Sequence, residues 1–361
     1  MNGIAAAIGD LVQKIGRPVR LMEVCGTHTV AIFRHGIRDL LPAGVSLLSG
    51  PGCPVCVTAI ADVDRAVALA RQPGVLLATF GDLLRVPGSA MSLAEARAGG
   101  AQVAVVYSPL DALELAAANP GHQVVFFATG FETTSPLIAA TLLTAQERAT
   151  GNFSILSVHK LVPPALRALV ATPELAVDGF LLPGHVSAII GVDPYRFIAA
   201  EGGRPAVVTG FAAADILEGI WLLLRQLAAG AARVENQYQR VVRPEGNPRA
   251  LALLDAFFEP ADAVWRGLGT IPASGLTLKP AYAELDASRR LPVAVPAARE
   301  PAGCDCGAIL RGLKTPPDCR LFGRACTPER PVGACMVSSE GSCAAYHRYG
   351  QRPAPPVGPA A

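Results

Sequence analysis

Short apolar segments alternate with longer amphipathic segments from the N-terminus to about residue 230. The apolar segments are rich in β-branched residues, which is typical of strands that are buried on both faces of a sheet. They predict strands at residues 19–24, 45–48, 75–79, 103–107, 124–128, 155–158, 179–182 and 206–209. The segments between them predict helices at residues 59–72, 92–98, 133–145, 164–170 and 213–227. Such alternation indicates parallel sheets, and two sets of four strands favour two similar α/β lobes over one large sheet.

The pattern changes beyond residue 230. Residues 233–280 combine one predicted helix, 248–258, with turn residues, and residues 291–301 are rich in Pro and Ala, as a linker would be. The segment 304–349 is dense in cysteine and poor in long apolar runs, so it needs a bound metal to hold it together. We therefore predict a first α/β domain at 1–120, a second with a helical extension at 121–295, a small metal domain at 296–350 and a disordered tail at 351–361.

Composition narrows the classes of protein that this chain can belong to. A net charge of +2 argues against a general nucleic-acid binder, which would carry a strong basic excess. The N-terminus lacks the basic and apolar regions of a signal peptide, and no run of about 18 apolar residues predicts a membrane span. We therefore expect a cytoplasmic protein, in which clustered cysteines serve metal binding or catalysis more often than disulfides.

Six of the nine cysteines crowd into the C-terminal segment. They are Cys304, Cys306, Cys319, Cys326, Cys335 and Cys343. The last four are widely spaced, as the loop ligands of an iron–sulfur cluster can be, whereas zinc sites usually show paired CxxC motifs. We predict that Cys319, Cys326, Cys335 and Cys343 hold a 4Fe–4S cluster, with Cys304 and Cys306 in reserve; a zinc site is the alternative.

Two further cysteines form a CxxC motif, Cys53-Pro-Val-Cys56, between a predicted strand and the helix at 59–72. A thiol near a helix N-terminus is favoured as thiolate, and a second thiol beside it permits reversible disulfide chemistry. Half of a metal site is the competing interpretation.

The remaining cysteine, Cys25, directly follows the first predicted strand, and His28 lies three residues further on. Ligands of open α/β sheets bind just beyond the carboxyl ends of the strands. His28 is expected to lower the thiol pKa, donate a hydrogen bond or act as an acid or base. The pair Cys25 and His28 is therefore a candidate catalytic site.

Other predicted strand ends also carry polar residues, which suggests that they converge on a cleft. One loop offers an Asp82–Arg85 pair, and Glu132, His159 and His185 follow later strands. Neither a GxSxG elbow nor a GxGxxG or P-loop motif is present, so the sequence shows no hydrolase or nucleotide fingerprint.

Several of these blocks occur together and in order. They are MEVCGTHT (22–29), GPGCPVCVT (50–58), TFGDLLRVPGS (79–89), GFETTSP (130–136), LLPGHVSAIIG (181–191) and the block from CDCGAILRG (304–312) through CRLFGRAC (319–326) to GSCAAYHRY (341–349). With these motifs the chain resembles the HypD family, the maturation proteins of NiFe-hydrogenases, over nearly its whole length.

The resemblance implies two Rossmann-like α/β domains and a small 4Fe–4S domain. It implies a scaffold that works with the small chaperone HypC and holds an iron centre while cyanide and carbon monoxide ligands are added. HypE, working with HypF, would supply the cyanide. Cys25 would be the thiolate ligand of that iron with His28 beside it, and Cys53 and Cys56 would exchange electrons with the cluster.

Two other functions stay open on the residues alone. One is a cluster–dithiol oxidoreductase of the ferredoxin–thioredoxin reductase type, and the other is a zinc-stabilised interaction module. On the leading interpretation the chain is an assembly scaffold with thiol and iron–sulfur redox activity rather than a turnover enzyme.

Overall fold

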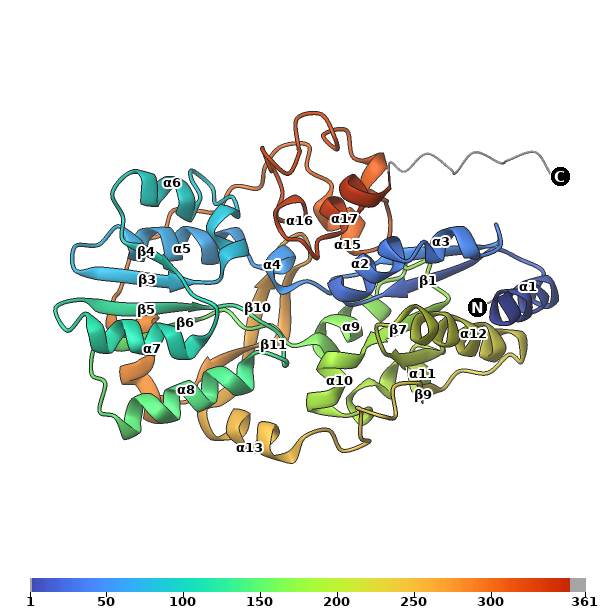
Figure 1. Cartoon of the computed structure of the whole chain (residues 1–361), viewed down its shortest axis with the longest axis horizontal. Helices are drawn as coiled ribbons and strands as arrows, with labels where there is room; N and C mark the ends of the chain where they lie inside the picture. Colours follow the sequence, from blue (N-terminus) through green and yellow to red (C-terminus); the bar gives the residue numbers. More distant parts are fainter. Residues whose placement is uncertain (1, 351–361) are drawn as a thin grey trace.

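Two α/β lobes lie side by side, and the cysteine-rich C-terminal segment sits above the junction between them (Figure 1). The computed structural model describes residues 2–350, so the predicted disordered tail lies outside the described residues. The fold class is confirmed: both large sheets are parallel and both are covered by helices. Within residues 2–350 no helix has the length and apolar character that crossing a membrane requires.

The first lobe is built on a five-stranded sheet in the order β2-β1-β7-β8-β9. These strands are β1 (Val19–Glu23), β2 (Val45–Ser49), β7 (Gly179–Pro183), β8 (Ala206–Thr209) and β9 (Val234–Asn236). One face packs on α1 (Asn2–Ile15), α2 (Gly26–Arg34) and α12 (Ala213–Ala228). Consecutive strand residues, such as Leu21 and Met22, are both fully buried, because the other face is also covered.

The second lobe has a four-stranded sheet in the order β4-β3-β5-β6. Its strands are β3 (Val75–Thr79), β4 (Val103–Val105), β5 (Gln123–Ala128) and β6 (Phe153–Ser157). The helices α5 (Ile60–Ala70) and α6 (Leu93–Ala98) cover one face, and α7 (Pro109–Ala118) and α8 (Ser135–Glu147) cover the other. Phe126 and Phe127 are buried on opposite faces of β5.

An antiparallel hairpin joins the lobes and was missed by the sequence analysis. Its strands are β10 (Phe258–Trp265) and β11 (Gly269–Leu278), preceded by α13 (Pro248–Phe257), which was expected. Thr58 forms a bridge to Trp265, and Lys160 forms a bridge to Gly275. The hairpin therefore contacts both segments by which the chain passes between the lobes.

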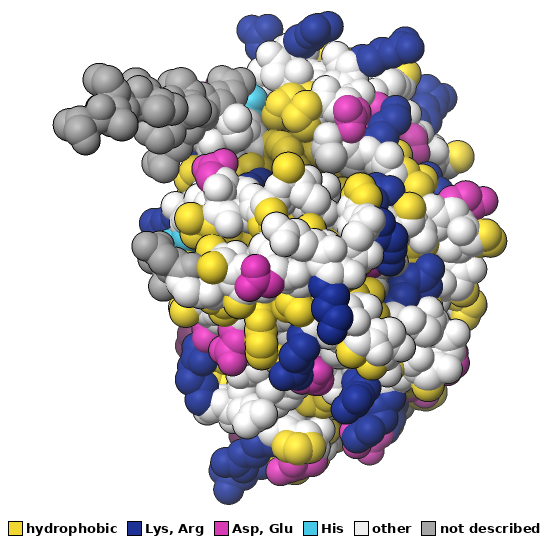
Figure 2. All heavy atoms as spheres, turned by 90° about the vertical axis from the view of Figure 1, so that its right-hand side faces the viewer, with side chains coloured by type: hydrophobic (Ala, Val, Ile, Leu, Met, Phe, Trp, Pro, Cys, Tyr) yellow, Lys and Arg dark blue, Asp and Glu magenta, His cyan; other side chains and the backbone are white. Residues whose placement is uncertain are grey.

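Short elements complete the described chain. They are α3 (Ile37–Leu40), α4 (Pro54–Val57), η1 (Gly81–Arg85), α9 (Val162–Val170), α10 (Gly184–Ile190), η2 (Asp193–Tyr195), α11 (Phe197–Ala200), η3 (Pro280–Leu285), α14 (Ala287–Arg290), α15 (Cys306–Leu310), η4 (Pro316–Asp318), α16 (Ala334–Val337) and α17 (Ser342–Tyr349). On the face in Figure 2, Arg and Lys side chains are interspersed with Asp and Glu side chains, and no single type covers the surface.

The eight predicted strands all form, but their assignment to lobes is corrected by the sheet order. The expected boundary at residue 120 cuts the second sheet between β4 and β5, and β1 and β2 share a sheet with β7 and β8. The chain leaves the first lobe after Ser49, builds the second lobe, and returns at Gly179. Local alternation reveals strands, but it does not reveal which sheet each strand joins.

Candidate functional site

A cavity of about 430 Å³ lies where both lobes and the C-terminal segment meet. Its wall includes Cys25 beyond β1, Phe131 beyond β5, His185 beyond β7 and Glu340 from the C-terminal segment. Loops at the carboxyl ends of strands in both sheets therefore converge, as the sequence analysis expected. Among the strand-end residues, Cys25 and His185 line this cavity, whereas His159 lines a different one.

Cys25 occupies the N-cap position of α2 and is 9% exposed. The backbone N–H groups of Thr27 and His28 and the Thr27 hydroxyl face its sulfur, and these contacts favour thiolate. Burial and then the Glu340 carboxylate outweigh them and raise the thiol pKa to about 12. The free side chain is therefore a thiol, and a metal cation must displace its proton on binding.

Two acidic residues surround Cys25. Glu23 accepts the Cys25 N–H at 3.1 Å and the Thr29 hydroxyl, and burial raises its pKa to about 7. Glu340 accepts a hydrogen bond from the Thr27 hydroxyl at 2.8 Å. The polar groups next to Cys25 therefore come from both ends of the chain.

The CxxC loop packs directly on Cys25. Gly26 N–H donates to the Gly52 carbonyl at 2.9 Å, and a Cβ on Gly52 would lie 2.2 Å from the Cys25 nitrogen. Gly26 has no room for a side chain either, because its Cβ would lie 2.6 Å from Glu340. Glycine is therefore required at both positions for the loops to approach each other.

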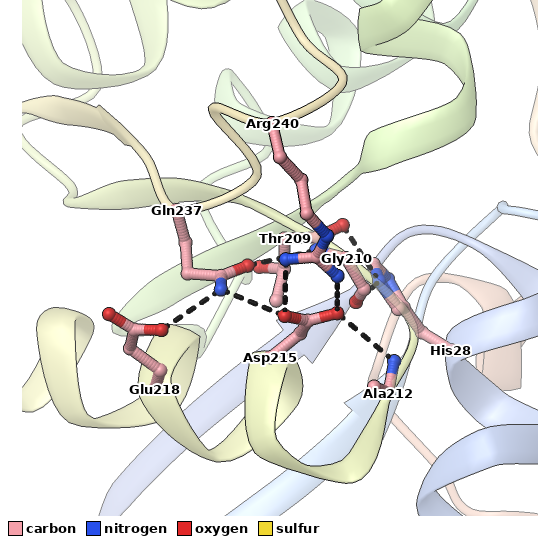
Figure 3. A network of polar contacts seen from close by, with 8 residues as sticks. All are labelled: His28, Thr209, Gly210, Ala212, Asp215, Glu218, Gln237 and Arg240. Carbon is pink, nitrogen blue, oxygen red and sulfur yellow. Dashed lines mark hydrogen bonds and ion pairs between the residues drawn. The ribbon is translucent and has the colours of Figure 1, made fainter.

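The His28 side chain points toward the end of β8, as Figure 3 shows. Its Nε2 lies 3.0 Å from the Gly210 carbonyl and 3.2 Å from the Thr209 carbonyl. Carbonyls only accept, so Nε2 carries the proton, and burial lowers the pKa of His28 to about 4. The expectation that its side chain lowers the thiol pKa is corrected: His28 is neutral and ties α2 to β8.

A polar network packs beside the turn after β8 that carries the Thr209 and Gly210 carbonyls (Figure 3). The Asp215 carboxylate accepts from Arg240, from Gln237 at 3.0 Å and from the Ala212 N–H at 3.2 Å. Gln237 also donates to Glu218 at 2.9 Å. The network joins the start of α12 to the loop after β9 and fixes the carbonyls that hold His28.

The dithiol is buried, with Cys53 4% and Cys56 1% exposed. The Cys56 N–H donates to the Cys53 sulfur at 3.4 Å, so Cys53 caps the short helix α4. The Cys56 thiol contacts both Cys53 and Cys335, and burial raises its pKa well above the usual range. The expectation of a low-pKa thiol is therefore wrong for Cys56.

The second lobe and the C-terminal segment meet at Cys53. Its thiol donates to the Ser338 hydroxyl at 3.4 Å, and that hydroxyl donates to Asp82 at 3.1 Å. Arg85 donates to the Pro328 carbonyl at 3.1 Å. The suggested Asp82–Arg85 pair does not form, because each side chain holds the C-terminal segment instead.

Five late cysteines line one apolar cavity together with Ile309, Leu321, Phe322 and Met336. They are Cys304, Cys306, Cys319, Cys326 and Cys343. Three of the four expected cluster ligands thus share this cavity, with the reserve pair, whose sulfurs lie 3.3 Å apart, beside them. An all-thiol donor set in an apolar enclosure fits an iron–sulfur cluster. Across residues 2–350, no three His, Cys, Asp or Glu side chains are already arranged around one metal ion.

Cys335, the fourth expected ligand, lies on α16 between this cavity and the dithiol. Its thiol contacts those of Cys306 and Cys56, and these contacts lower its pKa. The thiols of Cys53, Cys56, Cys335 and Cys306 therefore form a continuous series that leads into the cysteine-lined cavity.

Comparison with known proteins shows which family this chain belongs to. A family model described as "HypD: Hydrogenase formation hypA family" matches residues 1–350. This chain belongs to the HypD family. It is 51% identical over 343 residues to "Hydrogenase maturation factor HypD" of Azotobacter vinelandii, covering 93% of this chain and 90% of that protein. The proteins of the same name from Rhodobacter capsulatus and Escherichia coli (strain K12) are each 48% identical, over 358 and 337 residues. These matches cover 97% and 93% of this chain and 95% and 90% of the two proteins.

Several residues of this HypD-family site were not singled out from the sequence. Glu23, Ser338 and Glu340 contact or flank the thiols. Glu23 could have been found, because a carboxylate in a strand predicted to be buried on both faces is costly unless it has a role. Ser338 and Glu340 carry no comparable signal, because only the fold brings them to Cys53 and Cys25.

Proposed function

We propose that this HypD-family chain is a maturation factor of NiFe-hydrogenase that serves as an assembly scaffold with thiol redox activity. The names of its relatives support the process, since three of them are hydrogenase maturation factors. The observation that carries the proposal is the position of Cys25, whose single thiol lines a cavity shared by both lobes and the C-terminal segment.

The substrate in this proposal is an iron ion that acquires cyanide and carbon monoxide ligands. Cys25 is its anchor, because iron with strong-field ligands suits a soft thiolate donor. The α2 amides stabilise the thiolate once iron has displaced the proton, and Glu23 and Glu340 supply nearby acceptors. A HypC-like chaperone shares the iron, and HypE with HypF donates the cyanide.

The resident cofactor is a 4Fe–4S cluster, which supplies single electrons. Cys319, Cys326 and Cys343 hold it in the apolar cavity. We keep Cys335 as the fourth ligand, because its thiol contacts Cys306 inside the cavity and Cys56 outside it. Cys304 and Cys306 remain the reserve pair.

Bound in the apolar cavity, the cluster would lie beside Cys335, whose thiol contacts Cys56, so the two electrons of the Cys53–Cys56 dithiol–disulfide couple could pass to or from it one at a time. The Cys56–Cys335 contact also favours a second candidate, a cluster–dithiol oxidoreductase of the ferredoxin–thioredoxin reductase type. That candidate predicts disulfide reduction without a HypC-like partner and with Cys25 replaced.

The test is anaerobic purification with a HypC-like partner, followed by infrared spectroscopy and counting of iron and inorganic sulfide. Cyanide and carbonyl bands, together with about four sulfides per chain, support the scaffold. A cluster without those bands in the native chain, together with disulfide reduction that persists in a Cys25→Ala variant, supports the oxidoreductase. Zinc without inorganic sulfide contradicts both and favours the interaction module.

A further inference from the structure

A second cavity, of about 380 Å³, lies between the second lobe and the hairpin and shares no lining residue with the Cys25 cavity. It is bounded by the end of β6, the first turn of α5, the hairpin strands β10 and β11, and α14. The most distinctive residues in its wall are two consecutive ones, His159 and Lys160, which the proposed maturation chemistry does not use.

Lys160 is a buried cation with too few partners. The residue is 3% exposed, and the only acceptor for its ammonium among residues 2–350 is Asp62, at 3.5 Å. An ammonium has three N–H donors, and a buried charge is costly unless these donors are satisfied. The cavity must therefore provide further acceptors for Lys160.

His159 is a buried acceptor with no donor. Its Nδ1 lies 3.0 Å from the Ser157 oxygen, and the Ser157 hydroxyl donates its one proton to the Leu276 carbonyl at 2.7 Å. Nδ1 must therefore be the donor to Ser157, which leaves Nε2 as a lone pair. Nε2 has no partner in the described part of the chain, although His159 is 1% exposed and lines the cavity.

The charges around the cavity restrict the ligand further. Arg65 lines it and has no ion-pair partner among residues 2–350, and the N-terminus of α5 also favours an anion. Three carboxylates, those of Asp62, Asp262 and Asp286, line it too. They disfavour a doubly charged anion but accept a hydrogen bond from an O–H group.

We propose that this cavity binds a singly charged phosphate group, either free dihydrogen phosphate or the singly protonated monoester of a small molecule. The phosphate oxygens accept hydrogen bonds from Lys160 and Arg65, and an O–H group of the phosphate donates to His159 Nε2. One ligand group then satisfies both the buried cation and the buried lone pair. No bond is made or broken in this step.

Isothermal titration calorimetry on the full chain, near pH 6 and in a phosphate-free buffer, tests the proposal. At about this pH a large share of phosphate monoesters carries one proton, whereas sulfate carries none. Inorganic phosphate should bind saturably, and sulfate should bind about tenfold more weakly, since it lacks the donor for His159. Tighter binding of glycerol phosphate than of phosphate identifies a monoester, and equal binding identifies the free ion. Absence of saturable phosphate binding, or equal binding of sulfate, overturns the proposal.

Two variants locate the binding. Lys160→Met should abolish phosphate binding, and Arg65→Gln, an exposed position that leaves the core unchanged, should weaken it several-fold. Arg249→Gln on α13 is the matched control and should bind as the native chain does. If Lys160→Met does not fold, Arg65→Gln decides: native affinity in that variant overturns the assignment to this cavity.

Discussion

The Cys25 cavity and the late-cysteine cavity both use sulfur, but they are built in opposite ways. Cys25 is a single thiol that helix amides contact and that Glu23 and Glu340 flank. It lies beyond the carboxyl end of a strand that the packed sheet holds in place. Five of the six late cysteines line a cavity with Leu, Ile, Phe and Met side chains, in a segment of short helices and turns.

The difference separates a place for a transient substrate from a place for a resident cofactor. We expect the first region to be stable without a metal, because its scaffold is a five-stranded sheet with its own apolar core. The second has little apolar area of its own, so the cluster that we propose would supply much of its stability. Replacing equivalent-looking cysteines in the two regions should therefore have unequal consequences.

The largest effect is expected for Cys326→Ala. Loss of a cluster ligand should remove iron and inorganic sulfide and open the segment 304–350, because in our proposal the bound cluster holds its short helices and turns together. Metal and sulfide analysis together with hydrogen exchange measures both. Full retention of sulfide with native exchange protection would show that Cys326 is not a ligand.

The Cys25→Ala variant is the matched counterpart. It should keep native iron and sulfide in the cluster and native exchange protection in 304–350, yet lose the cyanide and carbonyl bands of the proposed substrate. Its free energy of unfolding should change by only about 1 kcal/mol, since no large side chain is removed. Loss of sulfide in this variant would mean that the two regions are not independent.

Buried carboxylates make the stability of the first region depend on pH. Burial raises the pKa of Glu132, beside the cavity-lining Phe131, to about 7 from an ordinary 4.5. Between these values the folded chain binds more protons than the unfolded chain, so stability should fall as pH rises from 4.5 to 7. The contribution is up to about 3 kcal/mol.

Denaturant unfolding of Glu132→Gln across this range is the check. The amide still accepts from the Val162 N–H, which donates to Glu132 at 2.9 Å, so the variant should fold and show a shallower dependence. Glu95→Gln is the control, because hydrogen bonds from Ser92 lower the pKa of Glu95 and its contribution is lost only at lower pH. An unchanged slope of stability against pH in Glu132→Gln would refute the assignment. Burial also raises the pKa of Glu23 to about 7, so Glu23 contributes a pH dependence of the same sign.

The smallest effect is expected in the network behind His28. Asp215→Asn weakens the contacts with Arg240 and with the Ala212 N–H at the start of α12. We expect a loss of about 1 kcal/mol in the free energy of unfolding and no change in iron or sulfide content. Glu218→Gln, which touches only Gln237 in this network, should be close to neutral. A loss of sulfide in Asp215→Asn would break the proposed separation of the regions.

The strands were predictable because both faces of each sheet are covered. The segments 75–79 and 206–209 coincide with β3 and β8, since continuous apolar runs bounded by turns occur in few other settings. The hairpin was not predictable in the same way. β10 carries Glu259, Pro260 and Asp262 and is largely exposed, so it lacks the apolar signature of the other strands.

The site was predictable as a set of residues but not as a geometry. Position beyond β1 identified Cys25, and crowding identified the late cysteines. The orientation of His28 toward Gly210 depends on a carbonyl just beyond β8, 182 residues away in sequence, and no local pattern encodes it. The contact between Cys56 and Cys335 likewise exists only because the C-terminal segment folds back over α4.

The interrupted path of the first sheet has a consequence for synthesis of the chain. β3 to β6 are contiguous in sequence and can pair as soon as they leave the ribosome, whereas β1 must wait for its neighbour β7. Until then β1 has only its other neighbour, β2, to pair with, and the late cysteines emerge last of all. The thiols therefore meet only when synthesis is nearly complete, so a half-made chain offers no assembled pocket in which iron could be trapped prematurely.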